Sequence, residues 1–375
     1  MWCLQALKAE HDVTLLTTGR VDLETLNRYY GTDIRADEIH IRTPGTSPGS
    51  MLTSGAAALH GAWFQRFCRA VAAEFEVLIS TYNLCDFGRP AIHFLADFSW
   101  DDELRCTLHP TGSGLRGALH GVTPWRRWYL RLVRAAAWPS GRNLLAGEDL
   151  VIANSRWSAE ILKTRFGLTA PVVYPPVPGP EPEAAPTWEQ REDGFVCLGR
   201  LSPEKRVEEV VEIVRTVRQA TGANLHLHVL GGPLQSAYGR RLRVLAAEAG
   251  PWVRLEGEVS GPHKWELLTR HRYGLHACRG EAFGIAVAEM IRAGLVPFVP
   301  ALGGVREIVA HPVLEYTDQA EATRRIVAVL REPGQVAALR AHLERQAQQF
   351  SASRFVAGLQ GALQAFLERW GRGPS

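Results

Sequence analysis

Short runs of β-branched residues and leucine recur along this chain, separated by segments with the helical spacing of apolar residues. The runs occupy residues 13–17, 77–80, 150–154, 194–198, 225–230, 273–277 and 296–299. Strands that alternate with helices form parallel sheets, because each crossover helix returns the chain to the same edge of the sheet. The pattern therefore predicts an α/β protein with two doubly wound, Rossmann-like domains.

Proline marks the boundary between these domains. Residues 171–186 are so rich in proline that neither a helix nor a central strand is compatible with them. They are predicted to link an N-terminal domain, residues 1–170, to a C-terminal domain, residues 187–352. The last segment, 353–375, carries an apolar stripe that predicts a helix packing back across the folded domains.

Size and composition narrow the class of protein. A chain of 375 residues is too long for one ordinary core, and a cleft between two domains is where small ligands usually bind. The formal charge of +3 is too small to indicate a nucleic-acid partner. The six cysteines form no CxxC pair and indicate neither a zinc site nor a disulfide framework. Without a recognisable leader or a long apolar stretch, the protein is expected to be cytoplasmic.

The strongest local motif is GRLSPEKR, residues 199–206, directly after an apolar run. A turn at the carboxyl end of a strand in an open α/β sheet lies at the crevice where ligands bind. Arg200 and Lys205 could hold a diphosphate there and neutralise it as it leaves, because arginine binds phosphate bidentately and lysine acts as a point charge. The alternative is a solvated basic turn with Glu204 as internal partner.

A second motif, RGEAFGIAVAEMIRAG, occupies residues 279–294 and follows the run 273–277. Gly284 and Ile285 open a helix that is apolar on every side, which predicts a buried helix. Its free N–H groups and macrodipole would favour an anion such as phosphate.

Two glutamates belong to this motif. Glu289 lies inside the apolar helix and needs a partner, for which the vicinal hydroxyls of a ribose are suitable. Glu281 precedes the helix and would face the group attached to the phosphate. The alternative makes Glu289 the partner of a structural Arg or Lys and Glu281 a surface residue.

A glycine pair, Gly303 and Gly304, follows the run 296–299 and permits close backbone approach to a ligand, although an ordinary turn would also explain it. Three successive strand ends thus direct polar or flexible groups to one edge of the predicted C-terminal sheet.

These motifs, in this order, resemble the retaining GT-B glycosyltransferases of family 4, and the similarity spans most of the chain. VIANSRWSAEILKTRFG (151–167) and VYPPV (173–177) resemble the end of the N-terminal domain and the interdomain linker of that family. The similarity is greatest to members that add mannose to lipid-linked oligosaccharides. It implies transfer of a hexose from a GDP- or UDP-linked sugar to a glycan or lipid-linked acceptor, with retention of anomeric configuration.

The resemblance also implies roles for individual residues. Arg200 and Lys205 would hold the donor diphosphate, Glu289 the ribose, and Glu281 the hydroxyls of the transferred sugar. His93 resembles the N-terminal histidine that faces the reacting sugar, although a lone histidine after a strand is more often structural. No metal or other cofactor is implied, and Asp101 and Asp102 are expected to be loop or cap residues. The full donor set is Gly199, Arg200, Lys205, Glu281, Phe283, Gly284, Ile285, Glu289, Gly303 and Gly304.

The beginning of the chain departs from the family pattern. Members start with a strand and a Gly-Gly loop, whereas MWCLQALKAEHDV resembles only the segment after that loop. A start codon further upstream, a truncated chain or a degenerate paralogue would each explain this. The competing hypothesis is therefore a non-catalytic nucleotide-sugar-binding protein. A nucleotide-sugar epimerase is a further alternative, for which no catalytic base can be located.

Residues 115–139 combine arginines with tryptophans and a tyrosine. Such a mixture suits an interfacial helix on anionic lipid, which would help an enzyme with a lipid-linked acceptor at the cytoplasmic face of a membrane. The alternative is a helix whose aromatic residues form core.

Overall fold

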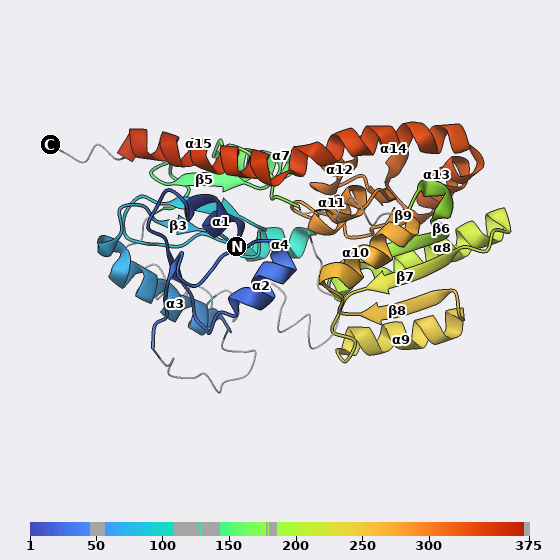
Figure 1. Cartoon of the computed structure of the whole chain (residues 1–375), viewed down its shortest axis with the longest axis horizontal. Coiled ribbons are helices and arrows are strands. Elements are labelled where there is room, and N and C mark those ends of the chain that lie inside the picture. The colour runs from blue at the N-terminus through green and yellow to red at the C-terminus, as the bar shows by residue number, and fades with distance from the viewer. Residues whose placement is uncertain (46–56, 109–127, 129–142, 178, 180–185, 371–375) are drawn as a thin grey trace. The chain divides into compact units, whose positions relative to one another are not determined.

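The computed structural model describes residues 1–45, 57–108, 128, 143–177, 179 and 186–370 (Figure 1). The chain divides into two compact units, one of Met1–Val173 with Val356–Ser375 and the other of Tyr174–Phe355. The first change of unit, after Val173, falls within the proline-rich segment 171–186. Each unit has its own parallel sheets and its own core.

The first unit contains two small parallel sheets. One consists of β1 (Thr14–Leu16) and β2 (His40–Arg42), and the other has the order β3-β4-β5, with β3 (Ile79–Ser80), β4 (Ile92–Leu95) and β5 (Leu150–Ala153). Its helices are α1 (Trp2–Leu7), α2 (Leu23–Tyr30), α3 (Ala57–Val71), α4 (Asp102–Leu108) and α7 (Arg156–Phe166).

Helix α7 shows how local sequence sets the elements of this unit. The Ser155 side chain accepts a hydrogen bond from the Ser158 N–H, and Gly167 ends the helix in the left-handed conformation that glycine adopts without steric cost. Leu162 then packs on Val151 and Ala153 of β5. Similarly, Asp101 accepts a hydrogen bond from the Leu104 N–H (2.8 Å) at the start of α4.

The second unit is built on a six-stranded parallel sheet with the order β11-β10-β9-β6-β7-β8. Its strands are β6 (Glu192–Leu198), β7 (His226–Leu230), β8 (Val253–Gly257), β9 (His271–Leu275), β10 (Val296–Pro300) and β11 (Glu315–Tyr316). Its helices are α8 (Val207–Thr221), α9 (Ala237–Ala249), α10 (Gly261–Arg270), α11 (Ile285–Arg292), α12 (Val305–Val309), α13 (Gln319–Arg331) and α14 (Pro333–Ala347).

The strand order of this sheet reverses between β6 and β9. From β6 the chain builds outward through β7 and β8, then returns to the other side of β6 for β9, β10 and β11. In open α/β sheets, ligands bind beyond the carboxyl ends of the strands at such a reversal. The topology therefore directs attention to the loops that follow β6 and β9.

Alternate residues of the central strands pack on opposite faces. Phe195 and Cys197 of β6 join the large core cluster that contains α8, whereas Val196 packs with Leu267 and Leu268 of α10. Both faces are thus covered by helices, as a parallel sheet requires.

The α/β fold with parallel sheets is confirmed, and all seven predicted runs contain strands. Strands β2, β4, β8 and β11 lie outside those runs. β2 and β11 have only three and two residues, and β8 (VRLEG) carries two charged residues, so their apolar signal is weak.

Helix α15 (Ala352–Trp370) corresponds to the predicted C-terminal helix. Its residues from Val356 belong to the first unit, where Arg369 donates a hydrogen bond to the Gly147 carbonyl (2.8 Å). The stripe residues Leu359, Leu363 and Phe366 are buried. Among the described helices, none combines the length and apolar character needed to cross a bilayer.

Candidate functional site

Three loops meet at the carboxyl edge of the second unit's sheet, beyond the neighbouring strands β6, β9 and β10. The loop after β6 contributes Lys205, the loop after β9 contributes Glu281, and the loop after β10 contributes Gly303. Glu281 contacts both of the others, through an ion pair with Lys205 and a parallel backbone bridge with Gly303. The structure thus brings these three residues together at the reversal of strand order.

The centre of the site is the ion pair between Lys205 and Glu281. The Lys205 Nζ lies 2.5 Å from Glu281 Oε2, and the side chains are only 18% and 23% exposed. The His276 Nε2 lies 3.4 Å from the same oxygen. Burial acts to raise the pKa of the Glu281 carboxyl, but His276 and the Lys205 ammonium outweigh it and hold the pKa well below its usual range. At neutral pH the site therefore contains a carboxylate that is ionised and ready to accept hydrogen bonds.

Because of this ion pair, the free energy of unfolding should decrease as the pH falls. Because the pKa of Glu281 is lower in the folded protein than its ordinary value of 4.5, the unfolded chain takes up the proton first as the pH falls. The contribution of Glu281 to stability is present above about pH 4.5 and is lost progressively below it. We expect the difference in unfolding free energy between the natural protein and Glu281→Gln to shrink from pH 7 to pH 3, measured by urea unfolding at several pH values. A difference that stays constant across this range contradicts the assignment.

The glycine pair after β10 supports the Glu281 loop. The Gly304 N–H donates a hydrogen bond to the Glu281 carbonyl (2.8 Å), and Gly303 has a φ of +100°. A Cβ at Gly304 would lie 2.3 Å from the Ala282 carbonyl oxygen. The close approach that the sequence predicted toward a ligand is therefore, in the structure, an approach to the protein's own loop.

We expect Gly304→Ala to destabilise the protein by about 1–3 kcal/mol, because the methyl group overlaps backbone atoms that cannot move independently. The measurement is the change in unfolding free energy, and Gly334→Ala is the matched control. A Cβ at Gly334 meets no atom within 4 Å, and the position lies in α14, so that change should be neutral or slightly stabilising. Equal effects of the two variants would show that Gly304 is not closely packed.

Helix α11 begins beside this loop. Gly284, at its N-cap, has a φ of +103° and makes no side-chain cap hydrogen bond. The prediction of a helix buried all round is wrong at its first residue, because Ile285 is 51% exposed. Phe283 is buried against Tyr174 and Phe350, so its side chain belongs to the core and only its backbone could contact a donor. The first turn of α11 is thus accessible at Ile285.

Glu289 has a protein partner. Its Oε1 lies 2.6 Å from the Nζ of Lys264 on α10, and the two side chains are 13% and 10% exposed. Burial raises the pKa of Glu289, and the Lys264 charge opposes that rise. Of the two sequence interpretations, the structure shows the pairing with a structural lysine, and a ribose would have to share the carboxylate with Lys264.

Arg200 is less fixed than its position after β6 predicted. Its side chain is 74% exposed and lies 3.7 Å from Glu204, an arrangement that contributes little in water. Gly199, the preceding residue, has a φ of +148°. A Cβ added at Gly199 would lie 4.0 Å from Lys205 Cε. Gly199 therefore leaves room beside the lysine, whereas Arg200 extends into solvent.

His93 does not face solvent. It lies on β4 of the first unit with an exposed fraction of 0%, stacked on Phe87 and with its Nε2 3.4 Å from Asp149 Oδ1. That His93 faces a reacting sugar stays a prediction, and in the structure its ring packs in the interior of the first unit. At the carboxyl end of β4 lies Asp97 instead, which accepts a hydrogen bond from the Tyr82 hydroxyl (3.0 Å).

Two residues of the site were not predicted, namely His276 and Lys264. His276 directly follows β9, so the strand-end argument applied to Glu281 could have found it. Lys264 lies 25 residues before Glu289 along the chain, and no local signal connects the two. Of the segment 115–139, only Trp128 is described, so the predicted interfacial helix lies outside the described residues.

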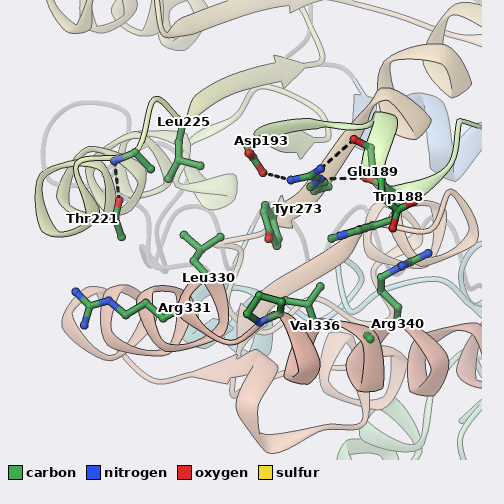
Figure 2. Close-up of a pocket in the computed structure, with 14 residues that line it drawn as sticks. Trp188, Glu189, Asp193, Thr221, Leu225, Tyr273, Leu330, Arg331, Val336 and Arg340 are labelled. Atoms are coloured by element: carbon green, nitrogen blue, oxygen red, sulfur yellow. Dashed lines mark hydrogen bonds and ion pairs between the residues drawn. The ribbon is translucent and has the colours of Figure 1, made fainter.

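A separate pocket of about 560 Å³ lies near the amino ends of the strands (Figure 2). Within it, the Arg272 guanidinium donates hydrogen bonds to Asp193 (2.6 Å) and to the Glu189 carbonyl (3.2 Å). The charged groups of Arg272 and Arg340 lie 5.6 and 4.5 Å from the centre of the Trp188 ring. None of the predicted site residues lines this pocket, and Arg272 is already engaged in structural contacts.

Known proteins resemble this chain at two levels: in the sequence of the second unit and in the fold of nearly the whole chain. Residues 182–350 match the family described as glycosyl transferases group 1. A GDP-Man:Man(3)GlcNAc(2)-PP-Dol alpha-1,2-mannosyltransferase of Eremothecium gossypii is 26% identical over 168 residues, which are 42% of this chain and 29% of that protein. The match thus spans less than a third of this curated relative.

Solved structures resemble nearly the whole chain. HepE of Anabaena, in complex with UDP-glucose, has a TM-score of 0.68 at 16% identity and covers 97% of this chain and 95% of its own. Sucrose-phosphate synthase of Thermosynechococcus elongatus has a TM-score of 0.70 at 15% identity, and the match covers 98% of this chain and 92% of the synthase chain. Identities this low establish the fold alone. Together these comparisons show that the chain has the GT-B fold and that its residues 182–350 are similar to the glycosyl transferases group 1 family.

Proposed function

We propose that this protein is a retaining glycosyltransferase that moves a hexose from a nucleotide diphosphate sugar to a glycan or lipid-linked acceptor. The observation that carries the proposal is the buried Lys205–Glu281 pair at the reversal of strand order, beside the first turn of α11. This arrangement offers a cation for a diphosphate and an ionised carboxylate for sugar hydroxyls within one small site.

The chemistry follows from the charges. Departure of a nucleoside diphosphate builds negative charge, which the Lys205 ammonium and the free N–H groups at the start of α11 would stabilise. The Lys205–Glu281 contact keeps both groups neutralised before the donor arrives. Once the diphosphate attracts Lys205, Glu281 becomes available to accept hydrogen bonds from the sugar.

The same charges favour transfer without a metal ion. His276, Cys278 and Glu281 offer ligand atoms within 4.8 Å of one another, but the Lys205 ammonium lies 2.5 Å from the carboxylate of that group. A divalent cation would have to displace it against electrostatic repulsion. The proposed transfer therefore relies on the Lys205 ammonium rather than on a metal ion.

Mannose is the favoured sugar and GDP the favoured carrier, because the curated relatives are named as enzymes that use GDP-mannose on a dolichol-linked acceptor. UDP is the alternative, supported by the UDP-glucose complex of HepE. A lipid-linked acceptor would place the protein at the cytoplasmic face of a membrane.

Thermal stabilisation by a panel of GDP- and UDP-sugars tests donor binding, since a ligand that binds the folded state raises its stability. Transfer or slow hydrolysis of the stabilising donor then tests catalysis. A donor that stabilises the protein but is never turned over identifies a non-catalytic binding protein. The proposal fails if no sugar nucleotide stabilises the chain.

Arg200→Ala is expected to weaken donor binding by about five- to tenfold, the loss of roughly 1 kcal/mol from an exposed cation near a diphosphate. Titration calorimetry with the stabilising donor measures it. Arg241→Ala removes an equally exposed arginine, 73% exposed on α9, and should leave the affinity unchanged. Unchanged affinity in Arg200→Ala would remove Arg200 from the donor site.

A further inference from the structure

Three histidines converge on one face of the second unit's sheet, near the amino ends of its strands. His226 and His228 lie two residues apart on β7 and share a face, and His271 begins β9. Their ring centroids are 4.5–5.2 Å apart. Each residue offers a ring nitrogen, and these nitrogens lie within 4.8 Å of one another.

The strand between them makes this convergence feasible. β6 separates β7 from β9, and Gly194 is the β6 residue in register with His226. A Cβ at Gly194 would lie 2.3 Å from His226 Nε2. The missing side chain therefore leaves the space into which the His226 imidazole extends.

Hydrogen bonds orient the two buried rings. His271 Nδ1 lies 2.6 Å from the Leu267 carbonyl, which only accepts, so Nδ1 carries the hydrogen and Nε2 has the lone pair. His228 Nδ1 lies 2.6 Å from the Glu256 carboxylate, which sets the same tautomer. Within the described part of the chain, neither buried Nε2 makes a hydrogen bond. A carboxylate or carbonyl behind each ring is the arrangement found behind metal-binding histidines.

A carboxylate, that of Glu192, lies beside two of the three rings. Glu192 of β6 places its Oε2 3.2 Å from His226 Nε2 and 3.9 Å from His271 Nε2, while its Oε1 accepts a hydrogen bond from Arg270 (2.6 Å). Burial lowers the pKa of all three histidines, that of His271 to about 4. A neutral imidazole is the form that coordinates a metal.

We propose that His226, His228 and His271, with Glu192, form a binding site for a divalent transition metal of the Zn²⁺ type. Three imidazoles and one carboxylate supply four ligands, and each is of a type that binds Zn²⁺. A tetrahedral Zn²⁺ with Zn–N distances of about 2 Å requires nitrogens about 3.3 Å apart, so the rings must draw together from separations of up to 4.8 Å. The site lies at the amino ends of the strands, opposite the Lys205–Glu281 edge, so its role is to clamp β6, β7 and β9 together.

The test uses the full chain, treated with a chelator and then titrated with Zn²⁺ in a calorimeter. We expect one Zn²⁺ per chain with sub-micromolar affinity and a Zn²⁺-dependent rise in melting temperature. His226→Ala should weaken binding at least about 100-fold. The control is His263→Ala, an exposed histidine of α10 paired with Glu266, which should bind Zn²⁺ like the natural protein.

Co²⁺ provides a readout that requires no variant to fold. The natural chain loaded with one equivalent of Co²⁺ should show the intense visible absorption of a tetrahedral complex. Octahedral Co²⁺ spectra, weak or absent Zn²⁺ binding, or equal affinity in His226→Ala and His263→Ala would each overturn the proposal. The cluster would then be three packed neutral histidines.

Discussion

Glu281→Gln is expected to lower the rate of sugar transfer by about 100-fold or more, the loss typical when one preorganised electrostatic partner is removed from an active site. The amide keeps the size of the side chain but removes its charge, so it can neither pair with the Lys205 ammonium nor accept two hydrogen bonds from the sugar as strongly. Initial rates at saturating donor are the measurement, because the effect should appear in kcat.

The matched control is Glu266→Gln, which makes the same replacement on an exposed side chain of α10. It should leave kcat unchanged. Circular dichroism and melting temperature establish that Glu281→Gln remains folded, since loss of the pair also costs some stability. Full activity in a folded Glu281→Gln protein would refute the role proposed for Glu281.

Glu289→Ala is expected to destabilise the second unit by about 3–5 kcal/mol, the usual cost of leaving one member of a buried ion pair without its partner. Lys264 would keep an ammonium that is only 10% exposed, and the Trp265 ring 4.9 Å away replaces only part of the lost attraction. Urea unfolding followed by circular dichroism measures the change. Glu266→Ala, at an exposed position of α10, should change stability by less than about 0.5 kcal/mol.

A double variant separates the structural role of Glu289 from ribose binding. Lys264→Met combined with Glu289→Leu removes both charges, and apolar replacement of a buried pair often restores stability. If the Glu289 carboxylate also binds the ribose, the stable double variant should still lose donor affinity. Natural affinity in a stable double variant would show that the pair is structural only.

Much of the fold could be predicted from the sequence. The spacing of apolar residues in a segment indicates a helix or a strand, whichever part of the protein that segment packs against. Strands β6 and β10 contain the apolar runs FVCL and VPFV, β7 (HLHVL) is mostly leucine and valine between its histidines, and α15 carries a clear stripe. Strand β8 could not be recognised because charged residues interrupt it, although its backbone pairs with β7 in parallel. Strands pair through backbone hydrogen bonds, so pairing alone does not require particular side chains.

The candidate site was predicted in part, for a related reason. Lys205, Glu281 and Gly303 each follow a strand, and the strands are parallel, so their loops had to meet at one edge. Their actual partners depend on which strands are neighbours. Lys264 reaches Glu289 only because α10 lies beside α11, and Lys205 reaches Glu281 only because β9 lies next to β6.

The sequence by itself determined the class of fold and the loops that carry charged groups, because periodicity and strand-end position are local properties. Only the tertiary structure decided that His93 is buried, that Glu289 is paired, and that His226, His228 and His271 form one cluster across Gly194. Burial and pairing are set by segments distant along the chain, and the free energy of a charge or an imidazole depends on those neighbours rather than on its own position in the sequence.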